Sequence, residues 1–254
     1  MTGNSYPFSF LDQTVNILIV SSSAENIAQF KSVLKSFPIF SLSSAETLQD
    51  ATTIMAANRI HICFLDLCIN ETKAASSTFI RSITNNTVCN GFSTECSATR
   101  VITSVKNGIL EVINVSGGLQ HTPEFTSLLC KSIIVALFYP NYRWWHDDMV
   151  ANVINTLLTL PKATVSAWAM KAGISATRLR TVCETKFSCS PKYISFFYNC
   201  YSLVLSYISR GGESEKKSLS EAAVLKEEFK LKCYFHSNYS SFSYLLKGTK
   251  TAHK

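Results

Sequence analysis

The stretch VNILIV (Val15–Val20) is a short apolar run of the kind that forms a strand buried on both faces of a sheet. The segment ENIAQFKSVL follows it and carries Ile27, Phe30 and Leu34 at helical spacing, which predicts an amphipathic helix. A buried strand that leads into an amphipathic helix is one unit of an alternating β/α fold. We therefore expect this part of the chain to form a parallel sheet with helices packed on it.

The same alternation continues through the first half of the chain. Further strands are predicted in IFSLSS (39–44), HICFLDL (61–67) and ILEVINV (109–115). Further helices are predicted in AETLQDATTIMAAN (45–58) and PEFTSLLCKSIIVALF (123–138). Elements of these lengths in this order predict an α/β domain whose parallel sheet is covered by helices on both faces.

The composition fits a protein with real hydrophobic cores. Of the 254 residues, 46% are apolar and 16% are charged, too few charges for a disordered chain. We see no signal peptide and no apolar run long enough to span a bilayer. The nine cysteines form no CxxC pair and no cluster of zinc spacing, so we expect reduced thiols in a cytoplasmic protein, without a metal or other cofactor.

Charge is divided unequally along the chain. Residues 1–135 hold 8 Lys and Arg against 9 Asp and Glu, a net charge of −1, whereas residues 136–254 hold 16 against 8, a net charge of +8. The second half therefore carries the whole basic excess, which favours contact with a polyanion; a basic helical surface without such a partner is the alternative.

Asp66, in FLDL, lies at the carboxyl end of the predicted strand 61–67, and at this residue the first half resembles the receiver domain of bacterial response regulators. The resemblance implies a flavodoxin-like fold for residues 1–138 in which Asp66 stands where the family accepts a phosphoryl group. The family also has an acidic pair after the first strand, a Ser or Thr after the fourth and a lysine after the fifth. Here the acidic pair is replaced by Ser21–Ser23, the hydroxyl is Thr94 or Thr103, and Ser116 lies near the lysine position. Hydroxyls replace carboxylates poorly as ligands of Mg²⁺, so we expect Asp66 to remain unphosphorylated.

The stretch AWAMKAGISATRLR (167–180) has the features of a helix-turn-helix. Gly173 can adopt the positive φ of a turn, and Ala169, four residues earlier, is small enough for close helix approach. Ser175 is a credible N-cap for the next helix, whose Leu179 and Val182 are expected to pack inward together with Ile174. Two helices joined by a glycine turn are also a common packing motif, so the pattern alone leaves both readings open.

Two later segments resemble the AraC family of transcription regulators. FSCSPKYI (187–194) is similar to the segment after the family's first recognition helix, and KCYFHSNYSSFSYLLKG (232–248) to its second helix-turn-helix. The resemblance implies an all-α DNA-binding domain at 147–254 with two helix-turn-helix units, joined to the first domain by a linker at 139–146. The residues that it places at DNA are Ser175, Thr177, Arg178, Arg180, Thr181, Ser237, Asn238, Ser240 and Ser241.

The chain also departs from the family pattern. Tyr234 replaces the turn glycine of the second unit, Lys230 replaces its small contact residue, and Tyr198 stands where the linking helix usually has an arginine. A tyrosine in a left-handed turn costs energy that glycine avoids. These departures leave two alternatives for the second unit: it reads DNA as in the family, or it docks poorly or packs without reading DNA.

Two classes of function follow. The first is a DNA-binding transcription regulator of a two-component system, with double-stranded DNA as its partner and with room for a homodimer through the receiver-like domain. The alternative is an interaction or dimerisation protein that has lost both phosphotransfer and DNA reading. No phosphate loop, catalytic triad or paired carboxylates favour an enzyme, and the histidines, including His61 and His146, read as structural.

Overall fold

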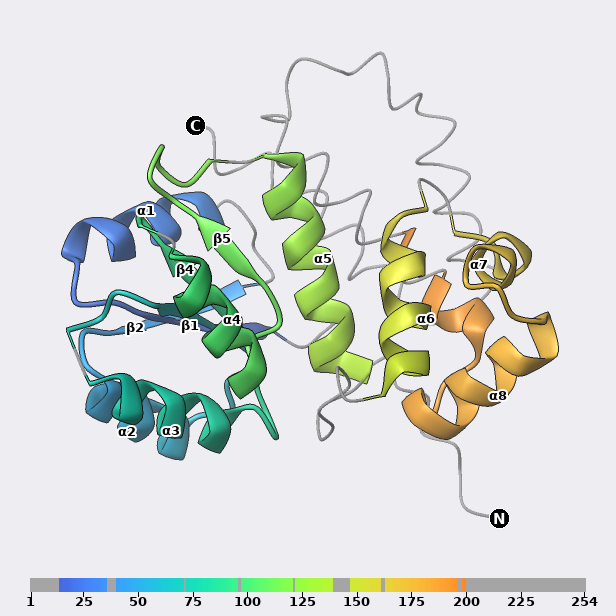
Figure 1. Ribbon diagram of the computed structural model, residues 1–254, viewed down its shortest axis with the longest axis horizontal. Helices are drawn as coiled ribbons and strands as arrows, with labels where there is room; N and C mark the ends of the chain where they lie inside the picture. Colours follow the sequence, from blue (N-terminus) through green and yellow to red (C-terminus); the bar gives the residue numbers. More distant parts are fainter. Residues whose placement is uncertain are drawn as a thin grey trace.

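The computed structural model describes residues 14–35, 40–70, 72–95, 97–120, 122–138, 147–160, 163–195 and 198–199. Within them the first half forms a parallel five-stranded sheet in the order β2-β1-β3-β4-β5 (Figure 1). Its strands are β1 (Val15–Val20), β2 (Phe40–Ala45), β3 (Ile62–Asp66), β4 (Val88–Ser93) and β5 (Val112–Asn114). This is the strand order of flavodoxin-like folds, so the predicted α/β architecture is confirmed.

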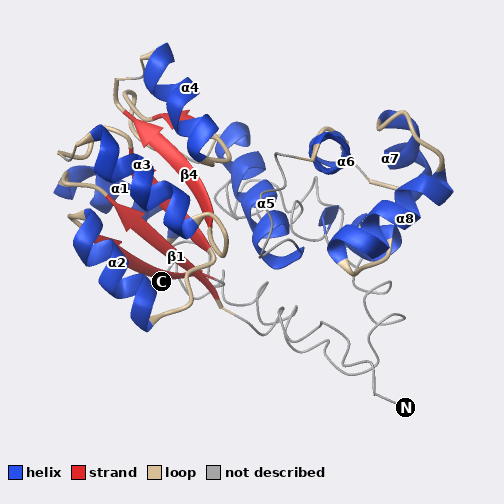
Figure 2. Cartoon of the chain, turned by 60° about the horizontal axis from the view of Figure 1, so that its bottom comes forward, coloured by secondary structure: helices blue, strands red, loops and turns tan. Residues whose placement is uncertain are grey.

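Helices cover both faces of this sheet (Figure 2). They are α1 (Ala24–Leu34), α2 (Leu48–Ala57), α3 (Lys73–Ile83), α4 (Ala98–Asn107) and α5 (Pro123–Phe138). The core on one face joins the sheet to α1 and α5, and the core on the other joins it to α2 and α3. Helix α4 lies beside α3, where Asn107 donates a hydrogen bond to Ser77 and accepts one from Arg81.

Side chains of β1 alternate between the two cores, as a strand buried on both faces requires. Ile17 and Ile19 belong to the core under α1 and α5, whereas Leu18 and Val20 belong to the opposite one. Four phenylalanines fill the first core, and the ring centroid of Phe30 on α1 lies 4.6–6.3 Å from the other three. These three rings are Phe64 on β3, Phe92 on β4 and Phe125 on α5. The aromatic cluster thus fastens two helices to the central strands.

Strand β4 carried no clear apolar pattern in the sequence, and the structure gives the reason. Its Asn90 is fully buried and donates a hydrogen bond to Ser132 on α5, 2.8 Å away. A Cβ atom on Gly91 would lie only 3.1 Å from the side chain of Leu67 and 3.2 Å from that of Ile109, so a larger residue would require these two side chains to shift. Strand β5 is also shorter than the predicted 109–115.

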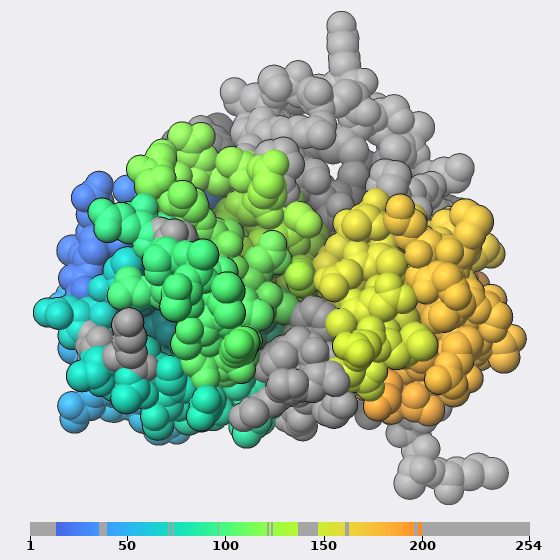
Figure 3. Space-filling view, in the orientation of Figure 1, coloured from blue at the N-terminus to red at the C-terminus, as the bar shows by residue number. Residues whose placement is uncertain are grey.

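The second half of the described chain is helical. Its helices are α6 (Asp148–Leu158), α7 (Val165–Lys171) and α8 (Ala176–Phe187). Helix α5 packs against α6, and one hydrophobic core runs without a break from the sheet through α5 into α6–α8. The two halves lie side by side in Figure 3, with α5 in green next to α6 in yellow. No helix among the described residues is long and apolar enough to cross a membrane.

Candidate nucleic-acid interface

Helix α6 holds α7 in place through one buried hydrogen bond. The indole N–H of Trp168 on α7 donates to the carbonyl of Val153 on α6 at 2.7 Å, and Trp168 is fully buried. The side-chain amide of Asn152 donates to the carbonyl of Ala172, just after α7, at 2.9 Å. Because α6 contacts both α7 and the turn that follows it, the direction in which α8 leaves the turn is fixed.

The turn between α7 and α8 has the predicted chemistry. Gly173 adopts φ 68°, a left-handed conformation that favours glycine. Ala169 is buried, and its carbonyl accepts a hydrogen bond from the N–H of Ile174 at 3.1 Å. Ser175 is the N-cap of α8, where its hydroxyl accepts a hydrogen bond from the N–H of Arg178. Two helices joined by a glycine turn therefore form at the predicted position.

Helix α8 has one buried and one exposed face. Leu179, Val182, Cys183 and Phe187 are buried, in agreement with the predicted inward residues, while Ile174 packs against the same core and is partly exposed. Burial raises the pKa of the Cys183 thiol to about 12, so this cysteine is an uncharged core residue. Of the residues predicted to contact DNA, the four within α8 lie on its exposed face: Thr177, Arg178, Arg180 and Thr181.

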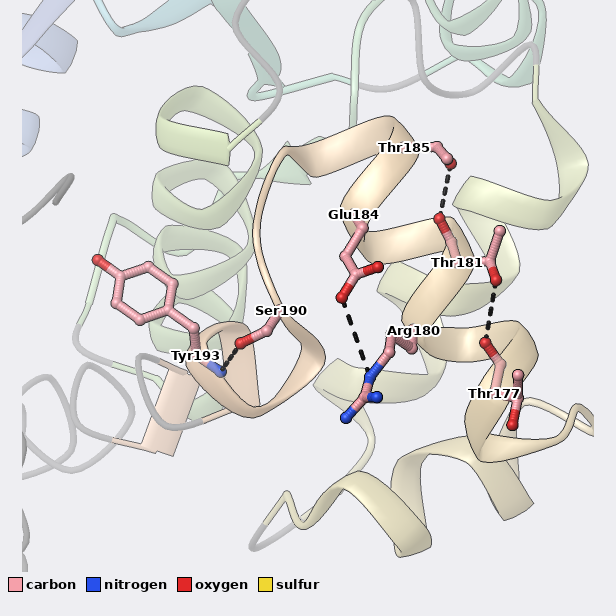
Figure 4. Close-up of polar contacts among 7 residues, drawn as sticks. All are labelled: Thr177, Arg180, Thr181, Glu184, Thr185, Ser190 and Tyr193. Atoms are coloured by element: carbon pink, nitrogen blue, oxygen red, sulfur yellow. Dashed lines mark hydrogen bonds and ion pairs between the residues drawn. The ribbon is translucent and has the colours of Figure 1, made fainter. Parts of the chain in front are cut away.

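The exposed face continues beyond the predicted residues. Glu184 and Thr185 lie one turn further along α8 and are also exposed. Glu184 forms an ion pair with Arg180 at 3.9 Å, with 57% and 72% of the two side chains exposed (Figure 4). Thr185 stands four residues after Thr181, which itself stands four after Thr177. This spacing was visible in the sequence and could have extended the predicted surface by one turn.

The chain leaves α8 through the segment FSCSPKYI. Ser188 adopts φ 53° and ends the helix in a left-handed conformation. The hydroxyl of Ser190 accepts a hydrogen bond from the N–H of Tyr193 at 3.3 Å and so caps the helical turn at 191–195 (Figure 4). Tyr198 follows and is buried, and its hydroxyl donates to the carbonyls of Leu158 and Leu160 at 3.2 and 3.0 Å. Tyr198 thus fastens this segment to the end of α6.

The predicted second helix-turn-helix lies outside the described residues. It includes the four candidate DNA contacts Ser237, Asn238, Ser240 and Ser241, and also the departures at Lys230 and Tyr234. The linker at 139–146 and His146 lie outside as well.

A second polar cluster surrounds Asp66 at the carboxyl end of β3. One carboxylate oxygen, Oδ2, accepts a hydrogen bond from the Ser21 hydroxyl at 2.6 Å and from the Asn26 amide at 3.3 Å. The other, Oδ1, accepts from the N–H of Cys68 at 2.8 Å. Asp66 is only 4% exposed. Three uncharged donors therefore hydrogen-bond to this buried carboxylate.

Among the described residues no three His, Cys, Asp or Glu side chains are grouped so as to hold a metal ion. Of the two hydroxyls considered above, Thr94 follows β4 and is exposed, whereas Thr103 lies within α4. Ser93 is the hydroxyl buried at the end of β4, where it bonds to the backbone of Glu95. Ser116 follows β5, as the sequence predicted.

Comparison with known proteins gives only structural likenesses. No protein-family model matches the chain, and no curated protein matches it either. A response regulator from Thermotoga maritima aligns with 24% identity over 40% of this chain and 84% of its own, with a TM-score of 0.36. RcsB from Salmonella typhimurium aligns with 11% identity over 74% of this chain and 99% of its own, with a TM-score of 0.41. RcsB bound to promoter DNA aligns with 12% identity over 78% and 99%, with a TM-score of 0.39.

Proposed function

We propose that the chain is a transcription regulator that reads double-stranded DNA through α8. The observation that carries this proposal is the exposed face of α8, where two arginines and two threonines stand together while the opposite face is buried. A helix with its back in the core and hydrogen-bonding side chains in front suits the major groove, which is wide enough to admit it.

The electrostatics of the second half support the same function. Residues 136–254 carry a net charge of +8, and the first 135 carry −1. Phosphate contacts by Lys and Arg supply much of the affinity of proteins for DNA, and base contacts supply the specificity. In this proposal Arg178 contacts the backbone, while Thr177, Arg180 and Thr181 face base edges and Ser175 begins the helix at a phosphate.

The finer proposal is an AraC-type domain with two helix-turn-helix units. Support for the first unit comes from the α7–α8 turn and from the segment FSCSPKYI with its capping serine. The second unit is proposed from the sequence alone, with Ser237, Asn238, Ser240 and Ser241 as its DNA contacts. Residues 1–138 are proposed as a receiver-like domain, with residues 139–146 as a linker and a homodimer formed through the sheet-bearing half.

The receiver-like domain is proposed to act without phosphorylation. Phosphoryl transfer needs a cation to neutralise the oxygens of the transferring group, and carboxylates are the usual ligands of such a cation. After β1, where the receiver family has its acidic pair, this chain has Ser21, whose hydroxyl donates a hydrogen bond to Asp66. Asp66 is therefore assigned a structural role in joining the ends of β1 and β3.

One observation favours the interaction protein as a second candidate. Ile102 and Val105 lie one turn apart on α4, with 54% and 42% of their surface exposed. Exposed apolar residues that lie together are typical of surfaces that meet another protein. A regulator with a protein partner at α4 would combine DNA binding with partner binding, whereas a protein that does not bind DNA would retain only partner binding.

The experiment is DNA binding by the full chain, measured by fluorescence anisotropy on labelled genomic duplexes over a salt series from about 50 to 200 mM. A regulator should prefer some duplexes at every salt concentration and lose affinity linearly on logarithmic axes. Salt-sensitive binding without preference, or the absence of binding, would favour the interaction protein instead.

A further inference from the structure

We propose that α8 recognises thymine through the methyl groups of Thr181 and Thr185. This inference rests on the DNA-binding function proposed above and names the base that the helix reads. It starts from a row of exposed threonines along one side of the helix, where Thr177, Thr181 and Thr185 follow one another four residues apart. Figure 4 shows the row along one side of α8, with Arg180 and Glu184 beside it.

The hydroxyl groups of two of these threonines turn back toward the helix. Thr181 donates to the carbonyl of Thr177 at 3.2 Å, and Thr185 donates to the carbonyl of Thr181 at 2.7 Å. Each hydroxyl hydrogen is therefore used within the helix, as is common for threonine in this position. The methyl group and the lone pairs of the hydroxyl oxygen are the parts of each side chain that are left to meet a ligand. Because threonine is branched at Cβ, its χ1 angle is stiff and the methyl group is held in place before binding.

The surroundings of the row limit what it can recognise. Arg180 lies beside it and is paired with Glu184 at 3.9 Å, so charged groups border the methyl groups. In the major groove, thymine alone among the four bases presents a methyl group, and threonine methyl groups contact it. Residues four apart on a helix are about 6 Å apart along its axis, close to two base steps of about 3.4 Å. Thr181 and Thr185 therefore fit two thymines separated by one base.

The threonine hydroxyl offers a competing explanation that can be separated by substitution. Its oxygen still has lone pairs and could accept a hydrogen bond from adenine or cytosine. Thr181→Val keeps the branched shape with two methyl groups and removes the hydroxyl. Thr181→Ser keeps the hydroxyl and removes the methyl group. The two variants therefore assign recognition to one group or the other.

The test uses the full chain and duplexes selected from a randomised pool by repeated binding. The best duplex is resynthesised with deoxyuridine in place of each thymidine, which removes only the C5 methyl group. Because burying one methyl-sized group corresponds to about a fourfold change in affinity, we expect the parent to lose about fourfold at each contacted thymine. Thr181→Ser should lose this difference at one of the thymines, while Thr181→Val should keep it whatever its absolute affinity.

A matched control comes from another helix. Thr53 on α2 is exposed and donates its hydroxyl to the carbonyl of Gln49 at 3.1 Å, the same arrangement as in Thr181. Thr53→Ser should bind both duplexes like the parent. Equal affinity of the parent for thymine and uracil duplexes would overturn the inference while leaving DNA binding by α8 intact. Loss of the difference in Thr181→Val but not in Thr181→Ser would also overturn it, and a chain that binds no duplex would overturn the proposed function as well.

Discussion

The hydroxyl of Ser21 donates a hydrogen bond to the carboxylate of Asp66 across 2.6 Å, and both side chains are buried. Ser21 also accepts a hydrogen bond from the N–H of Ser23, which is the N-cap of α1. A chain of hydrogen bonds thus runs from the start of α1 to the end of β3. Uncharged groups donate hydrogen bonds to this carboxylate. Phosphoryl transfer would instead need an acidic residue with a bound cation beside it.

We expect Asp66 to stay unmodified when the full chain is incubated with acetyl phosphate and Mg²⁺. The carboxylate oxygens accept hydrogen bonds from Ser21, Asn26 and Cys68, and the described residues hold no group of three His, Cys, Asp or Glu side chains that could bind the cation. Intact-mass and peptide mass spectrometry would measure the modification, and Asp66→Asn should bind DNA like the parent. A stoichiometric, base-labile phosphoryl group on Asp66 would show that the site is active.

The stability of the protein should fall when the pH is lowered from about 7 to 5. Nδ1 of His61 accepts a hydrogen bond from the N–H of Asn16 at 3.0 Å, and burial lowers the pKa of this histidine, with a further contribution from Arg59. Between the lowered pKa and the unfolded value of about 6.5, the unfolded chain binds more protons, so acid favours unfolding. Each unit of lowering corresponds to about 1.4 kcal/mol.

Urea denaturation at the two pH values measures this effect, and His61→Gln provides the comparison because glutamine does not titrate. The variant should lose less free energy of unfolding than the parent between pH 7 and 5. If parent and variant lose the same amount, protonation of His61 does not contribute.

Asp147 is expected to stabilise α6 at neutral pH. Its carboxylate caps the helix by accepting from the N–H of Val150 and forms a 2.9 Å ion pair with Lys186 on α8. Removing a capping Asp costs about 1 kcal/mol, so Asp147→Ala should lower the free energy of unfolding by about that amount. Asp148→Ala is the matched control, since Asp148 is the next residue, is exposed and does not cap the helix.

The pKa of Asp147 determines how the difference in free energy of unfolding between the parent and Asp147→Ala depends on pH. The hydrogen bond from Lys186 is the largest of the effects that lower this pKa, and the N–H of Val150 adds to it. A carboxylate with a lowered folded pKa stabilises the protein above its unfolded value of about 3.9 and loses this effect as the pH falls through the folded pKa. The difference between parent and Asp147→Ala should therefore close below about pH 4; a constant difference would exclude the charged form as its cause.

The parts of the fold that could be predicted are those in which the local pattern of apolar residues indicates which side chains are buried. β1, β3 and α5 carry apolar runs or faces, and their bounds were predicted closely. β4 was not, because Asn90 and Gly91 interrupt its apolar pattern for reasons that depend on Ser132 and Leu67. Contacts with residues far apart in the chain determine which residue types fit at these two positions, and a local sequence pattern does not reveal such contacts.

The two polar sites differ in the same way in how far they could be predicted from local sequence. Gly173 and Ser175 predict the turn and the start of α8 because their effect on the backbone is local. The bonds of Asp66 to Ser21 and Asn26 join residues 45 and 40 positions apart, and only the folded sheet brings them together. The expectation for α8 stopped at Thr181 because it followed the pattern of a family, whereas the exposed face runs on to Thr185.

Arg178 and Arg180 are expected to contribute differently to DNA binding, although both are exposed on α8. Arg180→Ala should relax the preference at one base pair, because arginine that contacts guanine discriminates by about 1–3 kcal/mol. Arg178→Ala should weaken binding equally on all duplexes and reduce the salt slope by about one unit, as expected for a phosphate contact. Anisotropy on single-base variants of a selected duplex measures both, and parental preference in Arg180→Ala would mean that this side chain does not read a base.

Glu184 is expected to restrain DNA binding by α8. It holds Arg180 at 3.9 Å and places a negative charge on the face that would meet the phosphates. Glu184→Gln keeps the shape of the side chain but removes the charge, so Arg180 is freed and the repulsion is lost. The variant should bind all duplexes several-fold more tightly, with a salt slope steeper by about one unit and with a smaller spread between preferred and other duplexes.

The control for charge alone is Glu46→Gln, because Glu46 is exposed beside α2 in the sheet-bearing half. Both variants change the net charge of the chain by the same amount, so a general electrostatic effect would raise the affinity in both. A local role predicts that only Glu184→Gln binds more tightly and that Arg180→Ala cancels most of its gain, since the two changes act on one ion pair. An equal gain in both Gln variants, or a full gain in the Glu184→Gln, Arg180→Ala double variant, would mean that Glu184 acts through overall charge and not through Arg180.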